Sequence, residues 1–405
     1  MGCAIEGVKE VMNHFRSSVQ VFLVFLKLGF TAFGGPVAHI AFFREEFVVR
    51  KRWMTESDYA EIVALCHFLP GPASSQVGLT IGLSRGGYLG SLAAWLGFTM
   101  PSAILLLFLA LGYSNYGDVI SLGLLTGLKI VTVAVVAQAV WGMSKSICID
   151  NTRITMMLLS AVGVLLFQSV YTPLGVMALA GIVGVWLFKP ILDLSESGLA
   201  FSISSFSGAL WFFVFILFLF GLPIIQLFVD QPLVDVVSAF FRSGSLVFGG
   251  GHVVLPLLEA EMVKTGWVTK DAFLAGYGAT QAVPGPLFTF AAFLGGILNG
   301  PISGVLGALV ALLSIFLPSF LLVYSVLPFW KSLRVKPRIR AALAGINSSV
   351  VGILFAVLYQ PVFLGGVSAP DDFIGVIIAF WALMYWKLPP WLVVIAGGAI
   401  GAVLL

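Results

Sequence analysis

Two kinds of helix-breaking interruption occur in this apolar chain, and each of them occurs twice. Phe33-Gly34-Gly35-Pro36 returns as Phe248-Gly249-Gly250-Gly251, and Leu69-Pro70-Gly71-Pro72 returns as Val283-Pro284-Gly285-Pro286. Glycine allows a close approach to the backbone and proline is favoured in the first turn of a helix, so each interruption is a candidate helix start. A helix start presents unpaired N–H groups and a partial positive charge. Four such starts brought together would form an anion site that needs few charged side chains.

Side chains close to the interruptions could complete such a site. Lys27 and Arg242 each lie six residues before a Phe-Gly-Gly sequence, and a cation in an apolar segment points to a functional site. Snorkelling to the membrane interface is the alternative for these cations, and tight helix packing is the alternative for the glycines. With the hydroxyls that follow the prolines, the predicted anion-binding residues are Lys27, Gly34, Gly35, Pro70, Gly71, Pro72, Ser74, Ser75, Arg242, Gly249, Gly250, Pro284, Gly285, Pro286 and Thr289.

Carboxylates and imidazoles near the interruptions are candidates for carrying protons. Glu46 and Glu261 occupy equivalent positions in the two copies, and Glu259 lies close to Glu261. Solvated helix ends and packed, neutral histidines are the alternatives. Lys129 lies in a later apolar segment, where the second copy has Asn347, so a role facing a cavity is open. The candidates for proton coupling are Glu45, Glu46, Glu261, His39, His67 and His252.

The composition is that of a membrane protein. The 405 residues are 60% hydrophobic and only 10% charged, whereas a soluble domain carries roughly 25% charged residues. Long apolar runs predict an all-α polytopic membrane protein. No basic stripe with interleaved aromatics indicates nucleic-acid binding. The sequence has no ATP-binding, metal-binding or dinucleotide motif, so we expect no cofactor, no metal and no enzymatic activity, and ion-gradient coupling or passive flow remains.

The repeated pattern predicts two homologous repeats of inverted topology. Segments of roughly 12–16 residues flank the interruptions, below the roughly 20 that a spanning helix needs, so each repeat should contain two re-entrant helical hairpins and about four transmembrane helices. The predicted divisions are 1–195, a linker transmembrane helix in 196–230, and 231–405. Lys and Arg then gather on one side, which places the N-terminus in the cytoplasm. Full crossing by the first segment of each repeat is the rival topology.

Several stretches resemble the chromate ion transporter family in its long, two-repeat form. They are the interruptions already described, Arg44-Glu45-Glu46-Phe47-Val48, Arg52-Trp53, Ala73-Ser74-Ser75-Gln76-Val77-Gly78 and Ala93-Ala94-Trp95-Leu96-Gly97-Phe98-Thr99. The resemblance covers essentially the whole chain. It implies a secondary transporter of the inner (plasma) membrane that exports chromate, is driven by the proton-motive force and confers chromate resistance. His67 departs from the family, where glutamine is expected, as at Gln281.

Other functions stay open beside this one. Sulfate, molybdate and chromate are all tetrahedral oxyanions, so the residues alone do not separate a chromate exporter from a transporter of sulfate or of another oxyanion. Sulfate is therefore expected as a competing anion. A passive anion channel is a second class, and a membrane-embedded chromate reductase is a third. The lipid bilayer is the expected surrounding, and a homodimer is left open.

Overall fold

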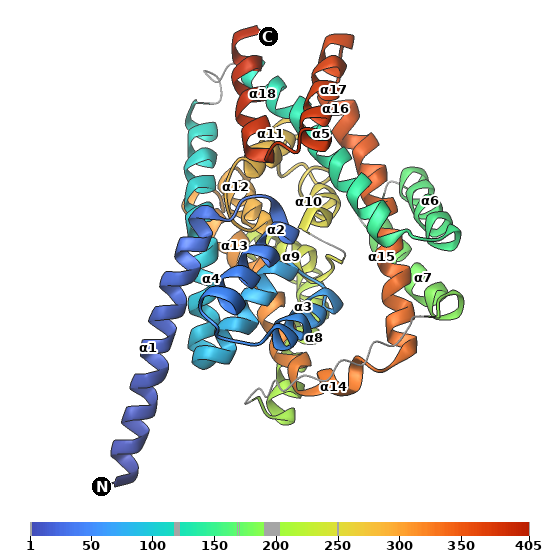
Figure 1. The fold of residues 1–405 in the computed structure, drawn as a ribbon. Helices are drawn as coiled ribbons and strands as arrows, with labels where there is room; N and C mark the ends of the chain where they lie inside the picture. Colours follow the sequence, from blue (N-terminus) through green and yellow to red (C-terminus); the bar gives the residue numbers. More distant parts are fainter. Residues whose placement is uncertain are drawn as a thin grey trace.

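Helices are the only regular elements in the part of the chain that the structure describes. The computed structural model describes residues 2–116, 122–167, 169, 171–189, 203–248 and 251–404 (Figure 1). The first repeat consists of α1 (Gly2–Thr31), α2 (Gly35–Arg44), η1 (Glu45–Arg50), α3 (Glu56–Phe68), α4 (Ala73–Tyr116), α5 (Leu122–Ile147), α6 (Asn151–Leu166) and α7 (Thr172–Leu187). Helix α8 (Ser205–Gln226) lies in the predicted linker.

The second repeat follows the same order with shorter pieces. It consists of α9 (Pro232–Ser245), η2 (Gly251–Val253), α10 (Val254–Met262), α11 (Lys270–Gln281), η3 (Leu287–Thr289), α12 (Phe290–Gly296), α13 (Gly304–Val326), η4 (Leu327–Phe329), α14 (Trp330–Leu333), α15 (Pro337–Val357), η5 (Leu358–Phe363), α16 (Leu364–Gly366), α17 (Pro370–Met384) and α18 (Pro390–Leu404). Helix α4 corresponds to α12 and α13 together, because Gly86 and Gly87 leave helical geometry inside α4. The duplication predicted from the sequence is therefore a duplication of helices.

Duplicated threonines begin the third helix of each repeat. The Thr55 hydroxyl accepts a hydrogen bond from the backbone N–H of Asp58 at 3.1 Å, at the start of α3. Thr269 does the same for Ala272 at 3.3 Å, at the start of α11. A side-chain oxygen at this position satisfies one of the unpaired N–H groups of the first turn. Thr55 and Thr269 thus have a local, structural role.

The first helix differs between the repeats. Helix α1 has 30 residues, whereas α9 has 14. The sequence predicted a short first segment in both repeats, and α1 is longer than this because no glycine or proline interrupts residues 8–28. The other segments around the interruptions are short, from 7 residues in α12 to 13 in α3.

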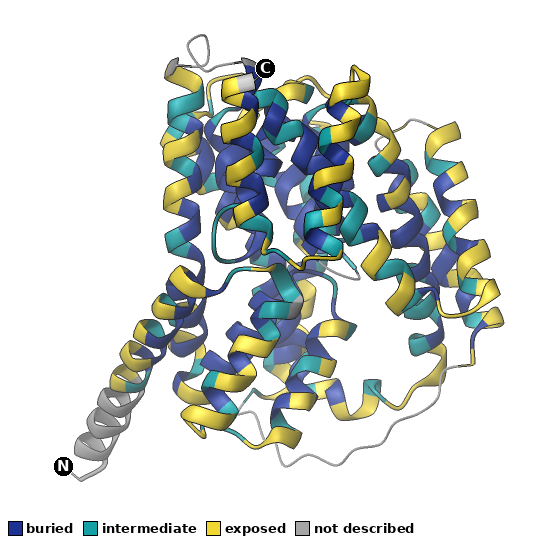
Figure 2. Ribbon diagram, turned by 45° about the horizontal axis from the view of Figure 1, so that its top comes forward, coloured by how far each residue is buried: buried dark blue, intermediate teal, exposed yellow. Residues whose placement is uncertain are grey.

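Five described helical segments are long and apolar enough to cross a membrane: Ala73–Asn115, Gly123–Ile147, Ser205–Gln226, Gly304–Leu333 and Pro337–Gly366. Four helical segments follow the interruptions in each repeat, but α6 and α7 have 16 residues and α17 and α18 have 15. At a rise of 1.5 Å per residue these are about 22–24 Å long, below the ~30 Å hydrocarbon thickness. Figure 2 shows exposed residues on the outward sides of the helices and buried ones in the interior.

The last two helices of each repeat pack against the other repeat. Helix α5 packs against α17 and α18 of the second repeat, and α15 packs against α6 and α7 of the first. Gly127 of α5 contacts Gly397 so closely that no Cβ could be accommodated, and Gly345 of α15 contacts Ala180 in the same way. Small residues allow such close helix crossings in membranes. Helices α5 and α15 run in opposite directions in Figure 1, so the two repeats are inverted.

The two ends of the molecule can be distinguished by their helices. The N-terminal end of α1, helix α3 and helix α14 lie toward one end, and α18 finishes at the other (Figure 1). We call the first the cationic end, because η1, α14 and the connections beside them contain Arg50, Lys51, Lys331, Arg334 and Lys336. The opposite end is called the far end.

Candidate functional site

The four interruptions meet where the two repeats touch. The backbone N–H of Gly71 donates to the carbonyl of Val247 at 2.7 Å, and that of Gly285 donates to the carbonyl of Ala32 at 3.0 Å. Each Pro-Gly-Pro sequence is therefore bonded to the residue just before the Phe-Gly-Gly sequence of the other repeat. Ala32 and Val247 are themselves equivalent, so the two bonds are related by the inversion of the repeats.

Serine side chains of the other repeat surround each Pro-Gly-Pro sequence. A Cβ added to Gly71 would lie 3.1 Å from Oγ of Ser319, and one added to Gly285 would lie 2.8 Å from Oγ of Ser102. Both glycines have positive φ angles, +118° and +102°, that side chains rarely tolerate. The hydroxyls of Ser319 and Ser75 are buried without a hydrogen-bond partner. Unpartnered donors in a buried position are available to an anion.

A cavity of about 470 Å³ adjoins these interruptions. Polar groups and glycines from both repeats line it: Gly34, Gly35, Gln138, His252, Gln281 and Lys387. Lys387 is the only charged residue among the described residues that line it, and the Nε2 amide of Gln281 is buried without a partner. Lys387 lies in the connection between α17 and α18, which Figure 1 shows turned toward the cationic end. The cavity is therefore electropositive and lined by hydrogen-bond donors.

Lys387 was not among the predicted site residues. It is the only Lys or Arg after Arg340, and this isolation in an apolar stretch is the signal that could have identified it. Lys387 reaches the cavity because α17 and α18 of the second repeat pack against α5 of the first.

Two of the three predicted proton-coupling histidines, His39 and His252, are held by hydrogen bonds. Nε2 of His39 lies 3.1 Å from the carbonyl of Ala32, the same carbonyl that binds Gly285, and Nδ1 lies 3.4 Å from Oγ of Ser74. Nδ1 of His252 lies 2.8 Å from the hydroxyl of Tyr277. His39 thus links the two interruptions, and only His252 of the two also lines the cavity. His67 is exposed on α3.

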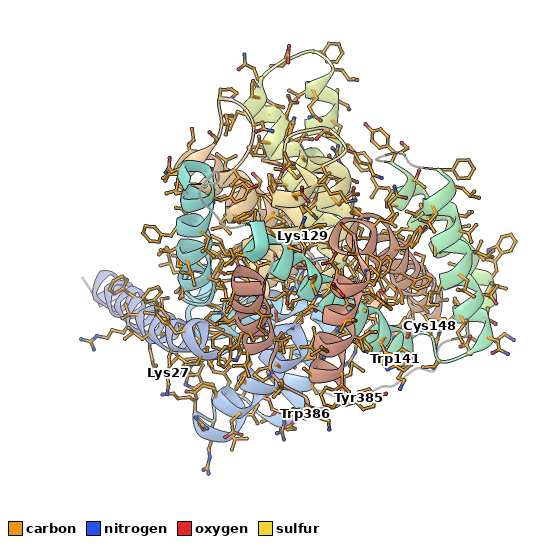
Figure 3. The ribbon with its side chains drawn as sticks, turned by 90° about the horizontal axis from the view of Figure 1, so that it is seen from above. Lys27, Lys129, Trp141, Cys148, Tyr385 and Trp386 are labelled. Atoms are coloured by element: carbon orange, nitrogen blue, oxygen red, sulfur yellow. The ribbon has the colours of Figure 1, made fainter. Side chains whose placement is uncertain are left out.

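The equivalent cations Lys27 and Arg242 have different surroundings. Nε and Nη2 of Arg242 donate to the two oxygens of the Glu261 carboxylate at 2.7 and 2.8 Å. Lys27 is exposed on α1, at the periphery in Figure 3, and is not brought to the interruptions. Glu46 lies 3.8 Å from Arg50. The sequence predicted that Lys27 and Arg242 have the same role beside the interruptions, but the two side chains lie in different surroundings.

Other predicted residues are satisfied locally or lie outside the described part. Thr289 donates to the carbonyl of Pro286 at 2.7 Å, and the carbonyl of the predicted residue Pro70 accepts a hydrogen bond from the amide of Gln76 at 2.6 Å. Glu45 accepts from Arg50 at 3.1 Å. Gly249 and Gly250 lie outside the described residues, and Pro72 and Pro284 flank the bonded glycines. No cluster of metal-ligating side chains occurs among the residues that the structure describes.

The Arg242–Glu261 pair is expected to stabilise the fold. Its side chains are 16% and 11% exposed, so Arg242→Gln would leave a buried carboxylate without its partner, at a cost of about 3–5 kcal/mol in the free energy of unfolding. We expect a lower melting temperature in detergent for Arg242→Gln and little change for Lys27→Gln. Equal melting temperatures for the two variants would contradict this role.

Inverted helical repeats, broken helices that meet at their interface and an electropositive cavity beside the breaks define a membrane transporter fold. Matches to one family cover residues 19–185 and 234–402, one for each repeat. The chain belongs to the chromate transporter family.

Relatives match over nearly their full length. An uncharacterized transporter of Methanocaldococcus jannaschii is 29% identical over 96% of this chain and 95% of its own. A chromate transport protein of Pseudomonas aeruginosa is 28% identical over 98% of this chain and 95% of its own. A probable chromate transport protein of Synechococcus elongatus is 27% identical, with 95% of each chain covered. No solved structure matches this chain.

Proposed function

We propose that this protein carries chromate out of the cytoplasm across the inner membrane by alternating access between its inverted repeats. The observation that carries the proposal is the reciprocal meeting of the four interruptions beside a cavity whose only charged lining residue, among those described, is Lys387. The names of the relatives from Pseudomonas aeruginosa and Synechococcus elongatus support chromate as the substrate. The same donors would accept sulfate, which we expect to compete.

The donors around the interruptions suit a tetrahedral oxyanion. Such an anion has acceptor oxygens in four directions, and both repeats supply donors. The unpartnered hydroxyls of Ser75 and Ser319 lie near Gly71, and the amide of Gln281 and the ammonium of Lys387 line the adjoining cavity. Fixed hydrogen-bond donors replace the water that the anion loses. The cavity contributes Lys387 without a competing carboxylate among its described lining residues, so the site favours an anion over a cation.

The membrane potential can drive the proposed export. Moving one charge through 100 mV is worth about 2.3 kcal/mol, so a dianion leaving a negative interior gains about 4.6 kcal/mol per 100 mV. The electrical part of the proton-motive force is therefore sufficient for export, and a proton that moves in the opposite direction would add the chemical part.

The test uses vesicles in which the two parts of the driving force are imposed separately. Everted membrane vesicles would take up chromate when a potassium diffusion potential makes their lumen positive, and excess sulfate would reduce the uptake. Uptake driven only by a pH gradient would instead indicate electroneutral exchange with protons. Uptake that neither gradient changes would indicate a passive channel, and sulfate uptake without chromate uptake would discard chromate as the substrate. A change in the oxidation state of chromium would indicate a reductase.

Removal of the Lys387 charge is expected to weaken binding. Lys387→Gln keeps a polar side chain but loses a charge-assisted hydrogen bond of about 1.5–3 kcal/mol, so the half-saturation concentration for chromate at the cationic end should rise about ten-fold or more. The measurement is the concentration dependence of uptake into everted vesicles. Lys331→Gln, which removes a cation at the same end that does not line the cavity, is the control. An unchanged half-saturation concentration in Lys387→Gln would remove Lys387 from the site.

A further inference from the structure

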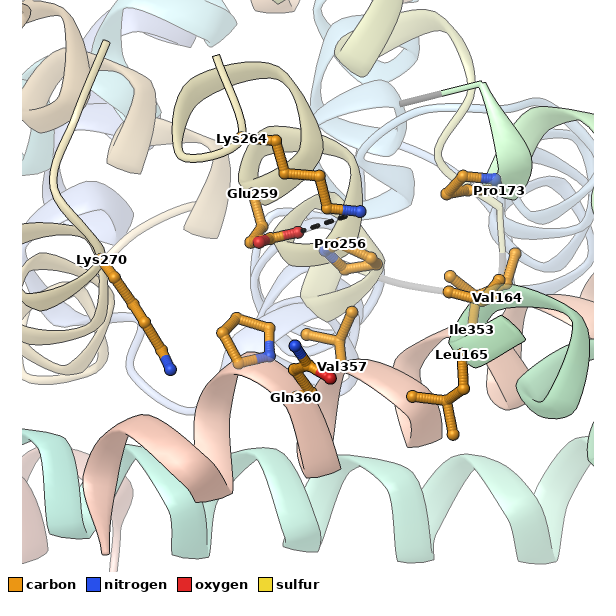
Figure 4. Close-up of a pocket in the computed structure, with 11 residues that line it drawn as sticks. Val164, Leu165, Pro173, Pro256, Glu259, Lys264, Lys270, Ile353, Val357 and Gln360 are labelled. Atoms are coloured by element: carbon orange, nitrogen blue, oxygen red, sulfur yellow. Dashed lines mark ion pairs between the residues drawn. The ribbon is translucent and has the colours of Figure 1, made fainter. Parts of the chain in front are cut away.

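A second, smaller cavity lies at the far end of the molecule. It measures about 160 Å³ and is formed by the C-terminal part of α10, the turn before α11, the end of α15 with η5, and the tip of the α6–α7 hairpin. Helix α15 starts beside α14 at the cationic end and runs away from it (Figure 1), so its C-terminal end and this cavity lie at the far end. Figure 4 shows Glu259, Lys264, Lys270 and Gln360 around the cavity.

The charges in this cavity are incompletely paired. The Glu259 residue is 7% exposed, yet the closest ammonium nitrogen, Nζ of Lys264, is 4.0 Å from its carboxylate. On the same helix, Glu261 receives two bonds from Arg242 at 2.7 and 2.8 Å. Lys270 also lines the cavity, so one carboxylate faces two ammonium groups. The cavity therefore carries an excess of positive charge that a second anion could neutralise.

The two cavities are separated by one helix. His252, in η2 directly before α10, lines the larger cavity, and Glu259, near the end of α10, lines the smaller one. The seven-residue step from His252 to Glu259 corresponds to about 10 Å of helix. Helix α10 thus forms a short barrier with an electropositive cavity on each side.

We infer that the cavity around Glu259, Lys264 and Lys270 is a second oxyanion site, where the anion and the Glu259 carboxylate compete for the two ammonium groups. The inference rests on the proposed transport of an oxyanion and assigns the site at which the anion meets the far side. The cavity has room for about five waters at about 30 Å³ each, and a tetrahedral oxyanion has five heavy atoms. Lysine ammonium groups bind such anions as point charges, without a fixed geometry.

Competition between the carboxylate and the anion makes binding dependent on pH. Burial raises the pKa of Glu259, and the charges of Lys264 and Lys270 oppose this effect. The other elements that line the cavity contribute no titratable group among their described residues: η5 supplies Gln360, and α6 and α7 supply Leu165 and Pro173. Below the pKa of Glu259 the carboxyl is neutral and both lysines are free for the anion, so binding at the far end should tighten as the pH falls.

The test measures the half-saturation concentration of sulfate and chromate from each side, with right-side-out and everted vesicles. We expect Lys270→Gln and Lys264→Gln to raise the value at the far end about ten-fold, the size expected for one lost charge-assisted bond, and to leave the value at the cationic end unchanged. Lys51→Gln, in the corresponding turn of the first repeat, should change neither value. Glu259→Gln should lower the far-end value at neutral pH and abolish its dependence on pH.

The outcomes separate this inference from the proposed function. Normal transport with unchanged far-end values in both lysine variants would overturn the second site. Equal changes at both ends would also overturn it, because they indicate a general effect on the protein. If the wild-type protein transports no oxyanion from either side, the proposed function itself is overturned.

Discussion

Gly71→Leu and Gly285→Leu should each abolish transport while the protein still inserts into the membrane. Each glycine has a positive φ angle and donates its N–H across the repeat interface. A left-handed backbone costs a non-glycine residue about 1–2 kcal/mol. The added Cβ would also lie 3.1 Å from Ser319 or 2.8 Å from Ser102, and the rest of the leucine would displace the serines at the junction. The initial rate of chromate uptake, divided by the amount of inserted protein, measures the effect.

Gly304→Leu is the matched control for the strain of the backbone. Gly304 also has a positive φ angle, +62°, but no heavy atom lies within 4 Å of the position that its Cβ would occupy. Substitution there should cost stability without removing transport. Normal rates in both Gly71→Leu and Gly285→Leu would show that the junction of the interruptions is not the route of the anion.

Locking α11 against α5 should stop transport reversibly. The repeats are not in the same state: α11 packs along α5, but the equivalent α3 does not pack along α15. Thr132 of α5 lies against Gly278 of α11, and the Thr132 hydroxyl bonds to the carbonyl of Leu274 at 3.3 Å. Lys129, for which the sequence left a cavity-facing role open, joins the same two helices through Asp271 at 3.0 Å. In the alternate state, α3 would pack along α15 and α11 would leave α5.

Cysteines at Thr132 and Gly278 test this directly. Their oxidation to a disulfide should hold the state described here, and chromate uptake should fall to background and recover after reduction. The matched pair is Ala64 and Val350, the equivalent positions on α3 and α15. Ala64 is exposed in this structure, whereas its equivalent Gly278 contacts α5 closely. Disulfide formation by Ala64→Cys and Val350→Cys should therefore occur only in the alternate state.

Two results would contradict alternating access in this form. Transport that continues at the normal rate with the Thr132–Gly278 positions fully cross-linked would exclude movement of α11 away from α5. A lack of cross-linking between Ala64→Cys and Val350→Cys during turnover would show that α3 does not move onto α15 in the alternate state.

The sequence by itself determined the properties that depend on local pattern. The apolar composition predicted a helical membrane protein. In lipid, only α-helices and closed β-barrels satisfy all backbone N–H and C=O groups, and the long apolar runs are those of helices. Glycine and proline act on the nearest turn, so the helix start at Gly35 and the break around Gly71 were predictable from a few residues. The duplication was visible because it preserves these residues, and the family match to both repeats agrees with it.

Only the tertiary structure decided which side chains reach the site. Lys387 lines the cavity because α17 and α18 pack against α5 of the other repeat, through glycines more than 250 residues apart in the chain, such as Gly127 and Gly397. Lys27 and Arg242 are equivalent in sequence, but only Arg242 is bonded to a carboxylate. The physical reason is that a broken helix specifies where donors can be unpaired, whereas contacts between distant segments specify which of them are unpaired.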